Sequence, residues 1–169
     1  MARRLATCPA LAHATLTLHG DLGAGKTTFV RHLLRALGVQ GRIKSPTYAV
    51  VEPHTTGTWP LLPAGQVLTI AHFDFYRFTD PREWEDAGLR EMFAHPGLKL
   101  VEWPQRAAGV MPPPDAELHI EPEPVAADAV SGTVSGAALD GEALPDSARR
   151  VWLNALTPTG QQLLAALRG

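Results

Sequence analysis

The stretch LHGDLGAGKTTFVRHLL, residues 18–34, has the most informative local pattern in the sequence. It crowds three glycines and a lysine between a short apolar run and a run with helical spacing. Gly20 to Thr27 match G-x-x-x-x-G-K-[ST], the phosphate-binding P-loop, in its required place after a strand and at the start of a helix. The glycines let the backbone curl so that successive N–H groups face phosphate oxygens. The stretch therefore predicts a nucleoside triphosphate site, with Lys26 on the β- and γ-phosphates and Thr27 on Mg²⁺.

The rest of the chain alternates between strand-like and helix-like patterns. Apolar residues at helical spacing, closed by Gly38, predict a helix over 26–38. We expect strands at 14–20, 47–54, 66–78, 97–103, around 116–122 and at 149–156. A Gly/Pro-rich segment, 55–65, reads as a hairpin loop, and the final residues from 157 read as a closing helix. This alternation predicts an α/β layered fold of the P-loop NTPase type, with a mostly parallel central sheet flanked by helices.

One further helix is expected from its start signal. Residues 80–93, DPREWEDAGLREMF, place Asp80 as the N-cap, Pro81 in the first turn and Glu83 to complete a capping box. From about 112 to 147 the chain is rich in Pro, Ala and Gly, and we expect an elaborated surface of loops and poorly packed β segments there. With 169 residues, the chain is expected to form a single domain, 1–169.

Composition limits the class of protein. The formal net charge is −2 and charged residues make up 19% of the chain, so a broad electrostatic nucleic-acid surface is not indicated. No apolar run approaches the ~20 residues of a membrane span, and no signal-peptide pattern opens the sequence. The single cysteine, Cys8, cannot form an internal disulfide, which fits a cytoplasmic location. We expect Cys8 to be buried rather than nucleophilic.

Hydrolysis needs an acidic residue at the metal and a way to position water. Glu102 follows the apolar run LKLV in the form of a Walker B element, and Asp74 lies in AHFDFYR. From position alone, either residue could face Mg²⁺ or merely cap a neighbouring element. If 66–78 is a strand, alternation sends His72, Asp74 and Tyr76 to one face and Arg77 to the other. Arg77 is then a poor candidate for an arginine finger.

A polar segment, KSPTY at 44–48, is a third candidate element. Pro46 stiffens it, and the Thr47 hydroxyl could serve a metal as switch threonines do in GTPases. An ordinary Ser-Pro turn entering a strand is the alternative interpretation.

Taken together, these motifs resemble one family. HGDLGAGKTT, SPTY, HFDFYR and LVEWPQR occur in the order and approximate spacing of the TsaE (YjeE) family, small bacterial P-loop ATPases needed for the threonylcarbamoyl modification of adenosine in tRNA. The resemblance covers about 11–106 well and is loose from 149 onward.

The resemblance implies roles for particular residues. The loop residues Asp21, Leu22, Gly23, Ala24, Gly25, Lys26, Thr27 and Thr28 would bind the phosphates of ATP or ADP. Thr27 and Glu102 would coordinate Mg²⁺. Asp74 would not bind the metal directly but would orient water or the metal's hydration. Ser45 and Thr47 would form a switch-like loop, and Trp103 would stand beside the site. The catalytic set would be Lys26, Asp74 and Glu102.

The resemblance also implies an activity and partners. The chain would be a weak ATPase stimulated by the TsaD–TsaB pair, in which TsaD performs the carbamoyl transfer, and it would meet tRNA only through that complex. A P-loop small-molecule kinase is one alternative, although no arginine-dense lid is present. A GTPase would need an N-K-x-D element, which the sequence lacks. A non-catalytic nucleotide sensor is the remaining alternative.

Overall fold

The computed structural model describes residues 1–80, 82–123 and 148–169. Six strands form one sheet in the order β2-β3-β4-β1-β5-β6. The four central strands β3, β4, β1 and β5 are parallel, while the edge strands β2 and β6 pair antiparallel to their neighbours. The strands are β1 Thr15–His19, β2 Val51–Thr56, β3 Leu68–Asp74, β4 Leu98–Glu102, β5 Ala116–Pro122 and β6 Arg149–Ala155. The predicted mostly parallel α/β sheet is confirmed.

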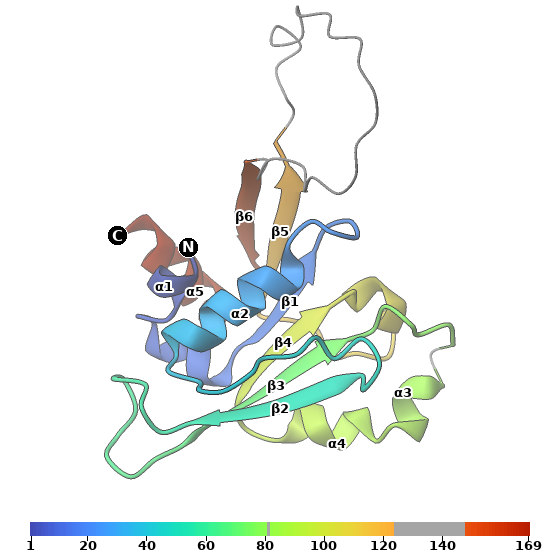
Figure 1. The fold of residues 1–169 in the computed structure, drawn as a ribbon, viewed down its shortest axis with the longest axis horizontal. Helices are drawn as coiled ribbons and strands as arrows, with labels where there is room; N and C mark the ends of the chain where they lie inside the picture. Colours follow the sequence, from blue (N-terminus) through green and yellow to red (C-terminus); the bar gives the residue numbers. More distant parts are fainter. Residues whose placement is uncertain (81, 124–147) are drawn as a thin grey trace, which may run out of the picture.

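Helices cover both faces of the sheet (Figure 1). On one side lie α1 (Ala2–Leu5), α2 (Lys26–Ala36) and α5 (Pro158–Arg168), and on the other lie α3 (Glu83–Asp86) and α4 (Leu89–Ala94). The described residues also include two 3₁₀ turns, η1 at Pro9–His13 and η2 at Pro104–Ala107. No helix within the described residues is both long enough and apolar enough to cross a membrane.

Each helical layer has its own apolar cluster. Val30, Leu33 and Leu34 of α2 are fully buried and belong to the cluster that also holds Leu16 and Leu18 of β1. The second cluster lies under α3 and α4 and is largely aromatic, with Phe73, Phe75, Phe78 and Trp84 as members. Burying a large apolar side chain contributes roughly 1.5–3 kcal/mol, so these clusters hold α2 and the strand ends firmly around the loop that joins β1 to α2.

Two expected strands are shorter than the sequence suggested. The strand expected at 47–54 begins only at Val51, because the Val50 N–H turns back to the Pro46 carbonyl at 2.7 Å and Val50 has φ of +67°. The strand expected at 66–78 ends at Asp74, whose carboxylate accepts the Tyr76 N–H at 3.0 Å and so starts a turn. Both corrections put functional candidates on turns rather than within strands.

The helix expected at 80–93 is also corrected. It is two short helices, separated where Gly88 takes φ of +64°. Glu83 accepts the Asp80 N–H at 3.0 Å as a capping box requires, yet the first helix begins at Glu83 with Arg82 as its N-cap. The Asp80 carboxylate instead binds the Arg82 backbone N–H and guanidinium. Pro81 lies outside the described residues.

Other expectations agree with the structure. The segment after β2 is a hairpin connection, β5 spans the expected 116–122, and Gly38 follows α2 in a left-handed conformation. Cys8 is buried. Of the elaborated surface expected at 112–147, the part from 124 to 147 lies outside the described residues.

Candidate functional site: a phosphate-binding loop facing two carboxylates

The loop that leaves β1 depends on glycine at its first position. Gly20 has φ of +143°, and a Cβ built there would lie 2.3 Å from the Ile120 carbonyl oxygen. Any side chain at this position would both strain the backbone and strike β5. Gly23 and Gly25 also have positive φ, but a Cβ on either would meet nothing within 4 Å. The loop is therefore confined by β5 at Gly20 and has free space beside Gly23 and Gly25.

Lys26 lies at the first turn of α2 and folds back over the loop. Its Nζ donates to the carbonyls of Gly20 at 2.5 Å and Asp21 at 2.9 Å, and lies 3.9 Å from the centroid of the Trp103 ring. Burial lowers the pKa of Lys26, while the nearby Glu102 and Asp74 carboxylates partly oppose that shift. The ammonium is thus held in a partly desolvated place where charge-assisted hydrogen bonds are strong.

Glu102 ends β4 directly opposite the loop. The Thr27 Oγ1 lies 2.9 Å from both Glu102 carboxylate oxygens and donates to them. Glu102 is 2% exposed, and its Oε1 also lies 2.8 Å from Nε2 of the fully buried His72. The register explains this meeting, since Glu102 aligns with Leu18 on β1 and with Asp74 on β3. The carboxyl ends of three parallel strands therefore converge on the P-loop, where ligands bind in open α/β sheets.

Asp74 is tied to the 45–47 segment. Its Oδ2 accepts the Thr47 hydroxyl at 2.5 Å, and Thr47 Oγ1 lies 2.9 Å from Ser45 Oγ. The Asp74 carboxylate is thus oriented by Thr47 on one side and by the Tyr76 N–H on the other. The structure brings the expected switch segment to the second acidic residue rather than to Glu102.

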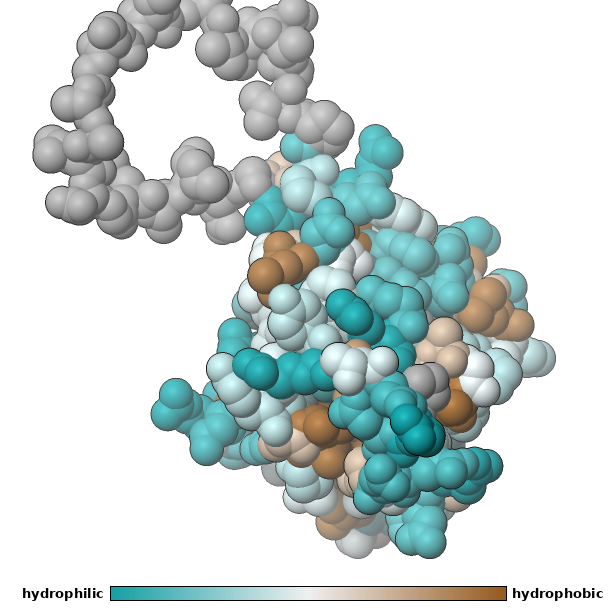
Figure 2. Space-filling view, turned by 90° about the vertical axis from the view of Figure 1, so that its right-hand side faces the viewer, coloured by the Kyte–Doolittle hydropathy of each residue, from teal (hydrophilic) through white to brown (hydrophobic). Residues whose placement is uncertain are grey.

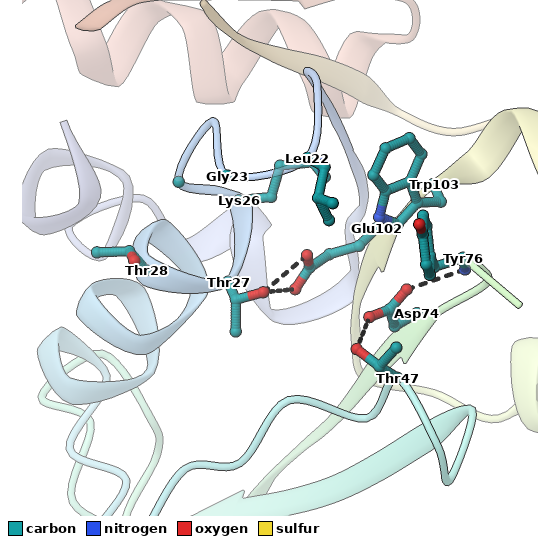
Figure 3. A pocket seen from close by; sticks show the side chains of 11 residues that line it. Leu22, Gly23, Lys26, Thr27, Thr28, Thr47, Asp74, Tyr76, Glu102 and Trp103 are labelled. Carbon is teal, nitrogen blue, oxygen red and sulfur yellow. Dashed lines mark hydrogen bonds between the residues drawn. The ribbon is translucent and has the colours of Figure 1, made fainter. Parts of the chain in front are cut away.

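A cavity of about 260 Å³ is enclosed by these groups (Figure 3). It is lined by Leu22, Gly23, Gly25, Lys26, Thr27, Thr28, Thr47, Asp74, Tyr76, Glu102 and Trp103. Three expected site residues lie around the cavity without lining it. Asp21 is exposed, and Ser45 contacts the cavity only through its hydrogen bond with Thr47. Ala24 is buried, and its carbonyl accepts a hydrogen bond from Arg149 at 3.2 Å.

Two contacts in the site could not be read from the sequence. Strand alternation places His72 on the same face as Asp74, but the His72 Nε2 lies 2.8 Å from Glu102 Oε1, while Asp74 accepts the Thr47 hydroxyl. Tyr76 follows the end of β3 and packs its ring 5.0 Å from that of Trp103. The HFDFYR motif contains both residues, yet strand alternation could not show that His72 contacts Glu102 or that Tyr76 packs against Trp103. Arg77 packs over the Tyr48 ring at 4.1 Å, away from the cavity lining.

The lining fits a phosphate chain with a divalent cation. The open glycine positions leave room for an anion against backbone N–H groups, and α2 presents its N-terminus there. Hydroxyl and carboxylate oxygens, from Thr27 and Glu102, are the ligand types Mg²⁺ prefers.

Comparison with known proteins agrees with this geometry. The family model for threonylcarbamoyl adenosine biosynthesis protein TsaE matches residues 1–129. The chain belongs to the TsaE family.

Relatives of this TsaE chain support the assignment. A Haemophilus influenzae protein named tRNA threonylcarbamoyladenosine biosynthesis protein TsaE is 42% identical over 104 residues, covering 62% of this chain and 60% of the relative. The Bacillus subtilis protein of that name is 43% identical over 88 residues, covering 52% of this chain and 49% of its own. The chain thus spans about half to three-fifths of the length of these relatives.

A solved structure is also similar. The crystal structure of Bacillus subtilis YdiB matches with a TM-score of 0.51 and 30% identity, covering 73% of this chain and 69% of that one. This likeness supports the layered α/β fold.

Proposed function

We propose that this TsaE-family chain binds ATP and ADP with Mg²⁺ in the cavity between the P-loop and the ends of β3 and β4. The observation that carries the proposal is the Thr27 hydroxyl held 2.9 Å from both oxygens of Glu102. This contact brings together the two oxygen ligands that a nucleotide-bound Mg²⁺ needs in a P-loop protein. Lys26, which also lines the cavity, supplies the positive charge.

Each residue then has a distinct task. The N–H groups of the loop and the Lys26 ammonium bind phosphate oxygens, for which Lys26 gives up its contacts with the Gly20 and Asp21 carbonyls. Thr27 and Glu102 would hold Mg²⁺, which when bound neutralises charge on the phosphates. His72 fixes the Glu102 carboxylate from its buried side. Asp74, fixed by Thr47 and the Tyr76 N–H, orients the attacking water.

We further propose that hydrolysis by the isolated chain is slow. Phosphoryl transfer is accelerated by cationic groups that stabilise charge in the transition state. The described lining of the cavity offers Lys26 but no arginine. A partner protein that supplies a cation, or orders the segment around Thr47, would complete the site.

The place of this activity is the biosynthesis of threonylcarbamoyladenosine in tRNA, with the TsaD–TsaB pair as the partner. The relatives' shared name supports the pathway. The surface supports a partner near the cavity, because the two most exposed large hydrophobic side chains in the described part of the chain are Tyr48 at 84% and Leu22 at 75%. They belong to the 44–48 segment and to the P-loop. Hydrophobic residues otherwise form small separate patches on the face seen in Figure 2.

The partner proposal is tested by capture. The tagged chain is incubated with purified TsaD and TsaB, with and without ATP, and recovered. We expect both proteins to be retained with ATP, and retention to fall for the double variant Leu22→Ser, Tyr48→Ser. The matched control is Leu61→Ser, which changes another exposed leucine, 41% exposed, in the hairpin connection. Absence of both partners from the recovered wild type contradicts the proposal.

A nucleotide sensor is the second candidate function. The observation that favours it is the same lack of arginine in the described lining. A sensor would bind ATP and TsaD–TsaB without releasing phosphate in any mixture.

A further inference from the structure

A second cluster of polar side chains lies on β1 and β5, beginning at the residue that precedes the P-loop. His19 is the last residue of β1, next to Gly20, and pairs in register with His119 of β5. Glu117 precedes His119 by two residues, so both point to the same face of β5. Leu118 and Ile120 point the opposite way into the apolar cluster under α2 and α5. Three strands that lie side by side in Figure 1, β1, β5 and β6, thus carry this polar face.

The three side chains converge. One potential ligand atom from each of His19, Glu117 and His119 lies within 4.8 Å of the other two. Tetrahedral coordination with bonds of about 2.0–2.2 Å separates ligand atoms by roughly 3.4 Å, so modest side-chain rotations bring the three into range. Glu117 and His119 are already 3.4 Å apart at Oε2 and Nε2.

We propose that His19, Glu117 and His119 bind a divalent transition-metal ion of the Zn²⁺ class. Two imidazoles and one carboxylate form a ligand set that suits Zn²⁺ and its neighbours, not Mg²⁺. None of the three residues lines the nucleotide cavity, so this site is distinct from the proposed Mg²⁺ site. Three protein ligands leave a coordination position for water.

The cluster is partly exposed to solvent and has polar neighbours. His119 and Glu117 are 25% and 30% exposed, so an ion can reach them from solvent. Burial lowers the pKa of His19, and the neighbouring His119 lowers it further, while the Glu117 carboxylate opposes the shift. Thr17 Oγ1 lies 3.0 Å from His19 Nε2, and Asn154 Nδ2 lies 3.3 Å from His119 Nε2, so a metal bound at either Nε2 would replace that contact.

Metal binding requires one rearrangement. The rings of His19 and His119 are stacked with centroids 4.6 Å apart, and the His119 ring stacks on Trp152 at 4.9 Å. A metal lies near the plane of each imidazole that ligates it, so the two histidine rings must tilt towards a common point. Tilting His119 alters its stack on Trp152 and gives the site an optical signal.

The test is a Zn²⁺ titration of metal-stripped chain against a chromophoric chelator, without nucleotide and in a large excess of Mg²⁺. We expect one Zn²⁺ per wild-type chain, with affinity at least about tenfold weaker in His119→Ala and in Glu117→Gln. His32→Ala is the matched control, because His32 is exposed on α2 outside the cluster. Glu102→Gln should also bind Zn²⁺ like the wild type.

A second measurement, tryptophan fluorescence, does not depend on whether His119→Ala folds. Zn²⁺ should change the tryptophan fluorescence of the wild type and of Glu102→Gln, but not that of Trp152→Phe. Less than one Zn²⁺ per wild-type chain overturns the proposal. So does equal affinity in His32→Ala and Glu117→Gln, or loss of binding in Glu102→Gln alone.

Discussion

The Thr27 hydroxyl and the Glu102 carboxylate, 75 residues apart in the chain, meet at 2.9 Å across the mouth of the cavity. The contact joins the first turn of α2 to the end of β4. Because Glu102 is almost fully buried and His72 contacts it from the other side, its carboxylate has little freedom to turn away. We take this pairing as the centre of the site.

Substitution of the two acids should separate their roles. Glu102→Gln removes the charge that meets the cation, so ATP affinity should gain little from added Mg²⁺, and turnover should be abolished. Asp74→Asn should leave ATP affinity within about twofold and mainly lower turnover, because the proposed role of Asp74 is to orient water. Fluorescent-ATP titrations with and without Mg²⁺, together with phosphate release, make the comparison. The reverse pattern would exchange the two roles.

Lys26→Ala should weaken ATP binding at least tenfold at fixed Mg²⁺. Each charge-assisted hydrogen bond from its ammonium to a phosphate contributes about 1.5–3 kcal/mol. Arg90→Ala, which removes a positive charge from the exposed face of α4, serves as the control. Equal affinity in the two variants would contradict the phosphate-binding role of the loop.

Gly20→Ala should destabilise the fold more than a similar change elsewhere. Its Cβ would lie 2.3 Å from the Ile120 carbonyl oxygen, whereas Gly41, also at positive φ, has nothing within 4 Å. Backbone strain of about 1–2 kcal/mol is common to both variants, and overpacking adds about 1–3 kcal/mol only at Gly20. Denaturant unfolding of both variants measures the difference. Equal losses would mean that β5 does not confine the loop.

Stability should fall in mild acid through two half-buried histidines, His19 and His54. Burial lowers the pKa of His19 and of His54 below the ordinary 6.5. As pH falls below about 6.5, the unfolded chain takes up protons that the folded chain resists, so the free energy of unfolding decreases until the folded pKa values are passed. The slope between pH 7 and pH 5 should be shallower in His19→Gln and His54→Gln than in the wild type. His32 is exposed on α2, so His32→Gln should keep the wild-type slope. A wild-type slope in all three variants would contradict the role of His19 and His54.

The parts of this protein that could be predicted from sequence are those fixed by local pattern. The glycine spacing and the apolar run of 29–37 specify the loop and α2 without help from the rest of the chain. Parallel packing then carries Glu102 and Asp74 to the same edge as the loop, because acids that end parallel strands meet there. The sheet was predictable for the same reason.

What sequence could not supply was the choice between alternative partners. His72 and Asp74 share one strand face, yet His72 contacts Glu102 of the neighbouring strand, because Thr47 reaches Asp74 from a turn. That turn itself arises from the Val50 N–H bond to the Pro46 carbonyl, where a β-branched residue adopts a positive φ. Nothing in local propensity favours such a conformation. The break at Gly88 is similar, since helical spacing continues across it.

We propose that a partner completes an ATPase site that this chain provides only in part. The decisive measurement is steady-state phosphate release from ATP by the chain alone, by the TsaD–TsaB pair alone and by their mixture. A cation supplied in trans can raise the rate by about 10³–10⁵, and ordering of the Thr47 segment alone would give less. We predict slow release by the chain and a rate in the mixture well above the sum of the two, abolished by Glu102→Gln. A mixture that only equals that sum would contradict partner-completed catalysis and favour the nucleotide sensor.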